Sequence, residues 1–239
     1  SMTLSRRDAI KVSGSAVAGL SMGVVDPENV FSQTAPEQEW PDQLVEGDLR
    51  VRAELPLNSD GSAPEHPDSA AGELVGTIWR FSSDRRQPPA DIDYDYNNLQ
   101  IKLDSRGLAK MSGTLKFSDL EALPRHSMVT LLQCGAPQPT GIVKWTGVRF
   151  SDFADMIGVG EPAHYCRLIS HDGYYIDEEM PTLRHPQVML AWMMNDEPLP
   201  PVNGAPIRLV IPFRYGARSI KAISEITFAS PGFSARIGD

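Results

Sequence analysis

Glycine and proline most restrict the fold of this chain, because 19 glycines and 20 prolines are spread over its 239 residues. Proline removes a backbone donor and glycine weakens a helix interior, so long helices should be few and loops many. Between these breakers lie short apolar or alternating runs, which predict strands. The runs cover residues 99–103, 128–133, 188–194, 207–213 and 223–228. We therefore predict a single α+β domain in which strands dominate.

Two short helices should interrupt these strands. Ser118 and Glu121 have the spacing of a capping box, so a helix should begin at Ser118 and end before Pro124. A second helix should begin at Ser151-Asp152 and end at Gly158, since glycine suits the left-handed conformation after a helix.

The composition is that of a soluble globular protein, with 41% hydrophobic and 22% charged residues. The formal net charge of −9 argues against a nucleic-acid-binding surface, since such a surface needs a basic face. A local basic pocket remains compatible with this charge. The two cysteines, Cys134 and Cys166, are too few for a disulfide framework.

The N-terminal residues predict a targeting segment. A charged start containing Arg6-Arg7 precedes a weakly apolar run, Val12 to Val25, which is shorter than the roughly 20 residues of a membrane span. This pattern resembles a twin-arginine signal peptide, with a short amphipathic helix as the alternative. We therefore expect a periplasmic or otherwise exported protein. The predicted parts are a signal peptide at 1–35, a linker at 36–47, the domain at 48–230 and a tail at 231–239.

Cys134 is the first candidate site residue. It follows the apolar run 128–133 and opens into Gly135-Ala136-Pro137, where a thiol can face a pocket. A soft thiolate suits a thiophilic metal. Two alternatives stay open: a buried cysteine that packs as a small hydrophobe, and a nucleophile with a histidine as its base. Cys166 lies in a strand-like run, where core packing is its expected role.

A basic segment that contains glycine is the second candidate. It gathers four cations within an acidic protein: Arg208, Arg214, Arg218 and Lys221. Gly216 would let backbone N–H groups approach an anion, Ser219 adds a hydroxyl, and arginine can bind phosphate oxygens in pairs. The segment therefore predicts a phosphate site, with a solvated turn between two strands as the alternative. The order of its glycines and lysine fits neither a Walker loop nor a Rossmann fingerprint.

Several segments together resemble the sulfite-oxidase family of molybdenum-cofactor enzymes. The match is loose at Phe81–Asp93, where Asp84 replaces a usual arginine and Arg85-Arg86 replace Asn-His. The remaining matching segments are Arg52-Ala53-Glu54-Leu55-Pro56-Leu57-Asn58, Leu131-Leu132-Gln133-Cys134, Lys144-Trp145-Thr146-Gly147-Val148-Arg149 and the block from Met193 to Phe228.

The resemblance implies a strand-rich molybdopterin-binding fold. It also implies molybdenum held by the dithiolene of one molybdopterin, with Cys134 as the only protein ligand. An oxygen atom then moves between metal and substrate while electrons move the other way. Tyr174 and Tyr175 follow a turn at Asp172-Gly173, and Tyr175 is assigned as the catalytic phenol. The residues expected at the pterin or its phosphate are Arg85, Arg86, Asn203, Arg208, Gly216, Arg218, Ser219 and Lys221.

Two departures from the family pattern affect the expected substrate and partner. Sulfite-oxidising members follow the cysteine with a run that contains arginine, whereas Cys134 is followed by the uncharged Gly-Ala-Pro-Gln-Pro-Thr-Gly. We therefore expect transfer of oxygen from a neutral S- or N-oxide, with sulfite oxidation as the alternative. The short stretch after Phe228 predicts no C-terminal dimerisation domain and no fused haem domain. Electrons should then pass through a separate electron-transfer protein, such as a cytochrome or a membrane haem subunit. A molybdopterin-binding module without redox activity is the alternative from another class.

Overall fold

The computed structural model describes residues 41–232. By its internal contacts the chain divides into two units, Ser1–Leu49 and Arg50–Asp239. The part of the first unit that is described, 41–49, contains neither helix nor strand and exposes its side chains. The predicted signal peptide at 1–35 lies outside the described residues. Within 41–232 the helices are too short or too polar to span a membrane.

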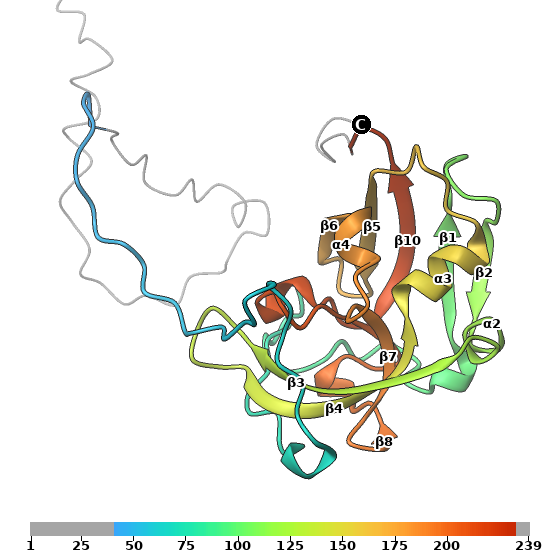
Figure 1. The fold of residues 1–239 in the computed structure, drawn as a ribbon, viewed down its shortest axis with the longest axis horizontal. Helices are drawn as coiled ribbons and strands as arrows, with labels where there is room; N and C mark the ends of the chain where they lie inside the picture. The colour runs from blue at the N-terminus through green and yellow to red at the C-terminus, as the bar shows by residue number, and fades with distance from the viewer. Residues whose placement is uncertain (1–40, 233–239) are drawn as a thin grey trace, which may run out of the picture. The chain divides into compact units, whose positions relative to one another are not determined.

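The strands of the second unit form two sheets (Figure 1). In Figure 1, β3 and β4 run across the view, whereas β1 and β10 run up it. Neighbouring strands are antiparallel, except that β1 and β10 are parallel. Sheet A has the order β3 (Arg125–Gln133), β4 (Thr140–Arg149), β7 (Met189–Met194) and β8 (Glu197–Pro198), and β9 (Arg208–Val210) also pairs with β7. Sheet B has the order β2 (Gly113–Lys116), β1 (Gln100–Asp104), β10 (Ile223–Ala229), β5 (Tyr165–Ser170) and β6 (Tyr175–Glu179).

The helices are short. The helix predicted at Ser118 begins one residue earlier, because the carboxylate of Asp119 rather than Glu121 accepts the backbone N–H of Lys116, at 2.8 Å. The second predicted helix ends at Gly158, whose φ of 69° is left-handed. The α-helices are α2 (Phe117–Glu121), α3 (Phe150–Ile157) and α4 (Met180–Leu183), and the 3₁₀ turns are η2 (Asp68–Ala70), η3 (Tyr96–Asn98), η4 (Pro201–Asn203) and η5 (Gly216–Arg218).

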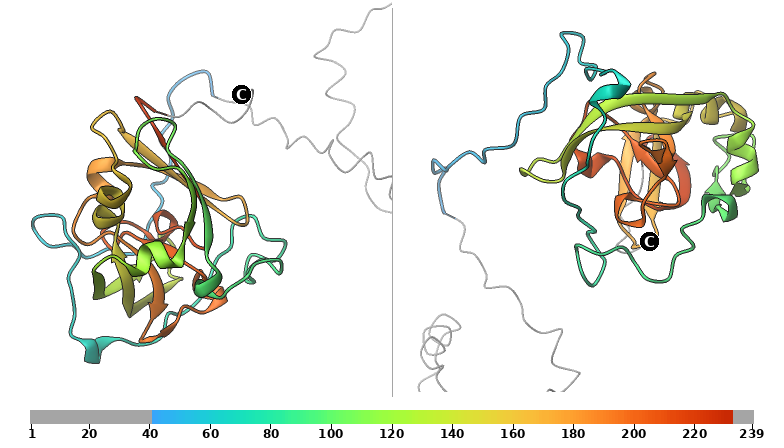
Figure 2. Two further views of the ribbon diagram at one scale, coloured as in Figure 1. Left: turned by 90° about the vertical axis from the view of Figure 1, so that its right-hand side faces the viewer. Right: turned by 90° about the horizontal axis from the view of Figure 1, so that it is seen from below.

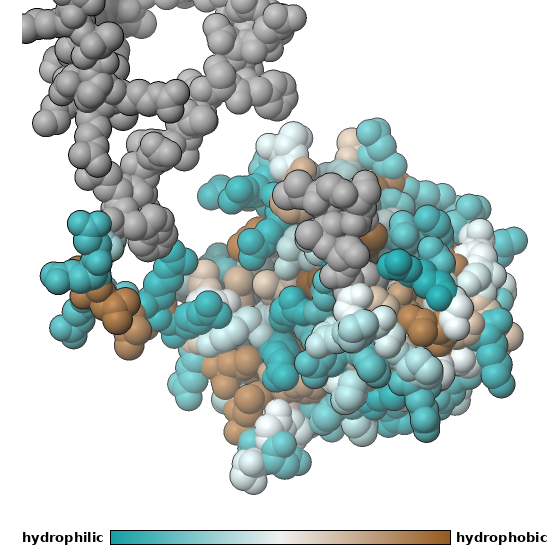
Figure 3. Space-filling model, turned by 90° about the horizontal axis from the view of Figure 1, so that it is seen from above, coloured by the Kyte–Doolittle hydropathy of each residue, from teal (hydrophilic) through white to brown (hydrophobic). Residues whose placement is uncertain are grey.

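The main core lies between sheet B, α3 and the inner strands of sheet A. On α3, Phe150 and Phe153 are fully buried, and each such ring contributes about 2–3 kcal/mol by leaving water. Cys166 on β5 is also fully buried, in agreement with core packing. The views in Figure 2 show how the sheet A strands cross those of sheet B. The face drawn in Figure 3 is mostly hydrophilic, with small and separate apolar patches.

Gly147 explains part of the sequence pattern at residues 144–149. A Cβ at this position would lie 1.9 Å from the carbonyl oxygen of Leu190 on β7, so a side chain cannot fit without moving the strands. The register between β4 and β7 also shifts at this point. The glycine therefore permits close contact of β4 and β7, and β7 in turn pairs with β9, which carries Arg208.

The predicted strand-dominated α+β fold is confirmed. The strand expected at 207–213 is shorter, because Pro206 and Pro212 flank β9 and cannot donate to a ladder. The boundary at Leu49/Arg50 separates two units that differ in their internal contacts. The predicted domain limits of 48 and 230 stay predictions.

Candidate functional site

The Cys134 loop begins where β3 ends. The backbone N–H of Cys134 donates to the carbonyl oxygen of Pro139, at 2.9 Å, which closes the loop. The buried Gln133 amide donates to the carbonyl oxygens of Cys134 and Ala136, at 2.9 and 3.0 Å. Its own oxygen accepts the Thr140 hydroxyl at 2.6 Å. The thiol is partly exposed and its loop is held by the first residue of β4.

A second loop packs against the end of β3. We call residues 214–219 the anion loop. A Cβ at Gly216 would lie 3.3 Å from the Leu132 side chain, so the two backbones are close. The Ala53 backbone ties both loops together, because its N–H donates to Gly135 O at 3.0 Å and its carbonyl accepts the Tyr215 hydroxyl at 2.9 Å.

A pocket lies between these two loops and residues 74–80. It encloses about 670 Å³ of open space, the solvent at its mouth included. Leu74, Ile78, Leu132, Pro139 and Ile220 give it an apolar lining. The lining residues with polar or charged groups are Trp79, Arg80, Cys134, Ser170, Asp172, Tyr174, Asn203, Arg208, Ser219 and Lys221.

Arg208 is the most buried cation of the pocket, with 1% of its surface exposed. Its guanidinium donates to the carbonyl oxygens of Asn203 and Ser219, at 2.7 and 2.9 Å. It also lies over the Trp145 ring, 4.8 Å from the centroid. Burial lowers the pKa of Arg208 to about 9, so the side chain still carries its charge at neutral pH.

Lys221 is the second cation. Its ammonium donates to Thr77 Oγ1 at 2.6 Å and to Val202 O at 3.0 Å, and it lies 4.8 Å from the centre of the Trp79 ring. Gly204, with φ of 111°, leaves room for it, since a Cβ there would lie 2.8 Å from Lys221 Cγ. Burial and the charge of Arg208 lower the pKa of Lys221 to about 7.

Three further polar groups of the pocket are one carboxylate and two buried hydrogen-bonding groups that have no partner within residues 41–232. Asp172 is the one carboxylate among the lining residues in the described part of the chain, and it accepts the backbone N–H groups of Phe81 and Tyr174. Two buried groups of the lining, Trp79 Nε1 and Ser170 Oγ, have no hydrogen-bond partner. Such orphaned groups are costly unless a ligand satisfies them.

The structure brings together six of the residues expected from the sequence. Cys134 and Asn203 line the pocket, and so do Arg208, Ser219 and Lys221. Gly216 contributes backbone from the anion loop. The hydroxyl of Ser219 accepts the backbone N–H of Ile211 at 2.9 Å, so this serine also fixes the loop.

Three expected arginines lie elsewhere. Arg218 points away from the pocket, because its Nε donates to Glu178 Oε1 at 2.6 Å. Arg86 lines an adjoining groove rather than the pocket itself. The Arg85 side chain is exposed and is not part of the lining, while its backbone carbonyl accepts the Trp79 N–H at 2.7 Å.

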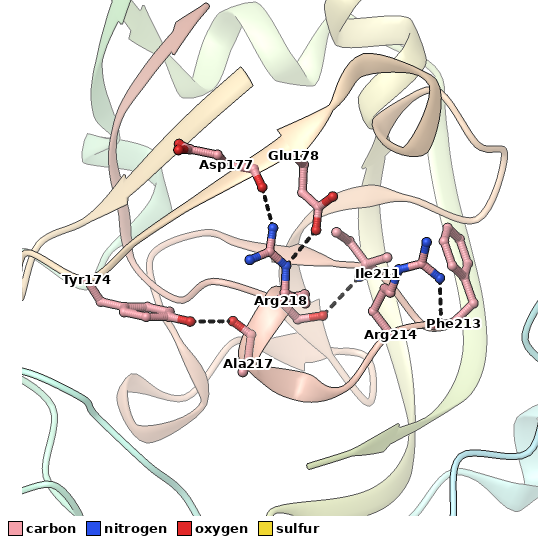
Figure 4. Close-up of polar contacts among 9 residues, drawn as sticks. Tyr174, Asp177, Glu178, Ile211, Phe213, Arg214, Ala217 and Arg218 are labelled. Carbon is pink, nitrogen blue, oxygen red and sulfur yellow. Dashed lines mark hydrogen bonds and ion pairs between the residues drawn. The ribbon is translucent and has the colours of Figure 1, made fainter. Parts of the chain in front are cut away.

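The assigned tyrosine also differs. Tyr174 lines the pocket and its hydroxyl donates to Ala217 O at 2.8 Å, as Figure 4 shows. Tyr175 is 38% exposed and lies against Arg167 on β5, with the guanidinium 4.5 Å from the ring centre. Successive side chains at the start of a strand point to opposite sides, so one phenol faces the pocket and its neighbour faces away.

The pocket geometry bears on the other readings of Cys134. No histidine is among the pocket residues within 41–232, so a base for a thiol nucleophile is not in place there. Across the same residues, no group of three His, Cys, Asp or Glu side chains could hold a metal. Cys166 is buried, and burial raises the pKa of its thiol.

Sequence reasoning missed Gln133, Trp79, Ser170 and Arg80. Gln133 carried a usable signal, because it directly precedes the candidate cysteine. Trp79 and Ser170 carried none, since they reach the pocket only through the packing of residues 77–80 and β5 around Lys221. Arg80 lines the pocket and lies over the Tyr174 ring at 5.5 Å, so the pocket contains an arginine although the run after Cys134 does not.

The chain is similar to several known proteins. A family described as "Oxidoreductase molybdopterin binding domain" matches residues 87–235. YuiH of Bacillus subtilis, an uncharacterized oxidoreductase, is 31% identical over 151 residues, or 62% of this chain and 76% of YuiH. MsrP of Campylobacter jejuni, a protein-methionine-sulfoxide reductase catalytic subunit, is 27% identical over 63% of this chain and 56% of its own length. The sulfane dehydrogenase SoxCD of Paracoccus pantotrophus has a similar fold, with a TM-score of 0.53 at 18% identity over 86% of this chain and 59% of that one.

The pocket of this strand-rich domain joins one thiol to two cations, an arrangement that suits an anionic cofactor. This chain belongs to the oxidoreductase molybdopterin-binding domain family, since the family matches more than half of its residues. Membership confirms the resemblance to the sulfite-oxidase family and the expectation of a molybdenum cofactor with molybdopterin. The chain spans little more than half of MsrP and of the SoxCD chain.

The residues of the pocket fit this cofactor. Arg208 is buried and Lys221 is half-buried, and within residues 41–232 neither makes an ion pair, although Asp172 of the same pocket acts on Lys221; two such cations suit the phosphate of molybdopterin. Trp79 Nε1 and Ser170 Oγ are orphaned groups suited to a heterocycle with many acceptors. Cys134 supplies one soft thiolate on the same pocket wall as Leu132 and Pro139.

Sulfate should bind the cofactor-free full-length protein more weakly as the pH rises through about 7. Anion binding raises the pKa of Lys221 above its free value of about 7, so binding above that pH takes up a proton. The affinity should then fall by at most about tenfold per pH unit for one linked proton. Calorimetric titration checks this. The Lys221→Arg variant stays charged and should show no such fall, and a flat profile in the parent would rule out the linkage.

Proposed function

We propose that the protein is a molybdopterin-dependent oxidoreductase that takes an oxygen atom from a neutral S-oxide. The observation that carries the proposal is the composition of the pocket. Cys134 and the cationic cradle of Arg208 and Lys221 line one pocket, and the wall formed by residues 78–80 and 172–174 combines apolar and aromatic side chains with one cation, Arg80, and one carboxylate, Asp172.

Each part of the pocket has a separate task in this proposal. Cys134 holds the metal, and Gln133 holds the Cys134 loop. Arg208, Lys221 and the anion loop hold the phosphate, while Trp79 and Ser170 orient the pterin. When bound, the molybdenum centre supplies the two-electron oxygen-atom transfer.

The wall beside Tyr174 favours a neutral substrate. Arg80 adds one positive charge and Asp172 removes one, so a dianion would gain little there. Ile78 lines this wall, and the ring of Phe81 lies beside it, 6.0 Å from that of Tyr174; the two side chains remain 42% and 61% exposed, which suits an apolar thioether arm. The name of MsrP, a reductase of protein methionine sulfoxide, supports the same substrate class.

Steady-state kinetics test the proposal. The kcat/KM for methionine sulfoxide, with reduced viologen as donor, should exceed the kcat/KM for sulfite, with ferricyanide as acceptor. Efficient sulfite oxidation with little sulfoxide reduction would overturn the proposed substrate class while leaving the cofactor assignment intact.

Sulfite oxidation is the second candidate, because Arg80 lines the pocket. The Cys134 loop lacks the arginine that binds sulfite in the sulfite-oxidising members. Arg80 could take this role only if the carboxylate of Asp172 did not offset the positive charge of Arg80. The Arg80→Ala variant separates the two functions: it should destroy sulfite turnover if Arg80 binds the anion, and should leave sulfoxide turnover nearly unchanged.

Replacing Tyr174 with phenylalanine should lower kcat/KM for the sulfoxide. The phenol lines the pocket, and its hydroxyl fixes the anion loop by donating to the carbonyl oxygen of Ala217 at 2.8 Å; loss of this hydrogen bond should displace the loop and cost about tenfold. The Tyr175→Phe variant is the matched control, since Tyr175 lies against Arg167 outside the pocket. Equal effects of the two variants would remove the assigned role of Tyr174.

We further propose that electrons reach the cofactor from a separate haem protein and that the protein is exported folded. The name of MsrP, a catalytic subunit, supports the first point. Arg6-Arg7 supports the second. Cell fractionation of the parent and of a variant with Lys at both positions tests export: the parent should reach the periplasm and the variant should stay inside.

A further inference from the structure

Arg218 belongs to the anion loop but does not enter the pocket. Its Nε donates to Glu178 Oε1 at 2.6 Å, and its terminal nitrogen donates to the backbone carbonyl of Asp177 (Figure 4). Both partners lie on β6, an edge strand of sheet B. The side chain of Arg218 therefore connects η5 to a sheet rather than to a bound anion.

Glu178 is held in place independently of Arg218, because it is buried and lies on a paired strand. Its side chain is 10% exposed, and a carboxylate so buried needs a partner. Glu178 is paired across the sheet with Cys166 on β5. In the neighbouring pair, the guanidinium of Arg167 donates to both carboxylate oxygens of Asp177, at 2.6 and 2.8 Å. β6 is thus anchored on β5 independently of the anion loop.

A second contact from the same region holds the other side of the loop. Tyr174, just before β6, donates to the carbonyl of Ala217 at 2.8 Å. Ala217 and Arg218 are consecutive, and Gly216, Ala217 and Ser219 all line the pocket. The positions of these backbone groups are therefore set by two side-chain contacts, one from each end of residues 174–178.

We propose that the Arg218–Glu178 ion pair is a latch that positions the anion loop for the cofactor, and that Arg218 is a positioning residue. The inference rests on the proposed role of this loop in holding the cofactor phosphate. Because Glu178 neutralises Arg218, the positive charge of the pocket comes from Arg208, Lys221 and Arg80. Loss of either partner should loosen the loop in the same way.

The test measures how fast the pterin leaves the purified holoenzyme, by the fluorescence of released and oxidised pterin. Arg218→Ala and Glu178→Gln should each speed release by about five- to tenfold, and the double variant no more than either single one, as for residues that act as a pair. Arg218→Lys should restore most of the parent behaviour. Ile157→Val is the control for lost stability, since Ile157 is buried on α3 and, unlike Cys166, is not paired with Glu178, so this variant should not change release.

Three results would overturn the latch. In the first, Glu178→Gln releases the pterin more slowly than the parent, whereas Arg218→Ala releases it faster. Arg218 would then be a direct ligand of the anion, and Glu178 would hold it back from that role. Unchanged release from both single variants would make the pair irrelevant to the cofactor. Faster release from Ile157→Val, matching that of the pair variants, would reduce the effect to general stability. If the parent carries no pterin, the proposed function fails first, so the two failures are distinguishable.

Discussion

Replacing Cys134 with serine is expected to lower turnover by more than about 100-fold, beyond what changes around a metal's ligands usually cost. The reason is chemical: a hydroxyl is a poor substitute for a soft thiolate on a thiophilic metal. Cys134 is partly exposed, so the free energy of unfolding should change by less than about 1 kcal/mol. Steady-state kinetics with the preferred oxide, together with urea unfolding, measure both quantities.

Cys166→Ala is the matched control for this experiment. Cys166 is fully buried on β5, away from the pocket, so its variant should keep full activity and lose stability of order 1 kcal/mol. Full turnover in Cys134→Ser would show that Cys134 is not the metal ligand. Loss of activity in both variants would point to a general effect of cysteine replacement on the fold.

Replacing Arg208 with alanine should have the largest effect on stability, a loss of about 3–5 kcal/mol. The substitution leaves the carbonyl oxygens of Asn203 and Ser219 without their donor and removes the group packed on Trp145. The cofactor should be lost as well, because the buried charge for its phosphate is gone. Urea unfolding and pterin content measure the two effects.

Arg214→Ala is the matched control for Arg208. Arg214 lies in the same basic segment but is exposed, and the one hydrogen bond recorded for its side chain is to the carbonyl of Phe213, at 3.5 Å. Its loss should change stability by no more than about 0.5 kcal/mol. Similar losses in the two variants would mean that the charge of the segment, rather than the buried position of Arg208, sets the stability.

The sequence predicts those elements that local patterns determine. The apolar runs at 128–133 and 223–228 form β3 and β10, and Gly158 ends α3 as expected. The strands β4 and β6 were not predicted, because tertiary pairing decides them. Lys144 in β4 is held by Asp68 and Asp196, and the acidic β6 is a strand because it pairs with β5.

The site residues likewise divide into those that local sequence patterns predict and those that only tertiary contacts place. Cys134, Arg208 and Lys221 lie in segments whose residue types and order predict their chemistry, and all three line the pocket. The directions of Arg218 and Tyr175 depend on contacts with Glu178 and Arg167 that form only in the folded chain, and no local pattern reveals those contacts. Trp79 is the clearest omission, since only the folded structure brings it to Lys221.

The coordination of molybdenum tests the central claim most directly. X-ray absorption at the molybdenum edge of the purified parent protein counts the sulfur ligands of the metal. Our account predicts one sulfur more than the pterin dithiolene alone supplies, and that sulfur comes from Cys134. A sulfur shell explained by the dithiolene alone, or a folded protein without molybdenum, would contradict the account.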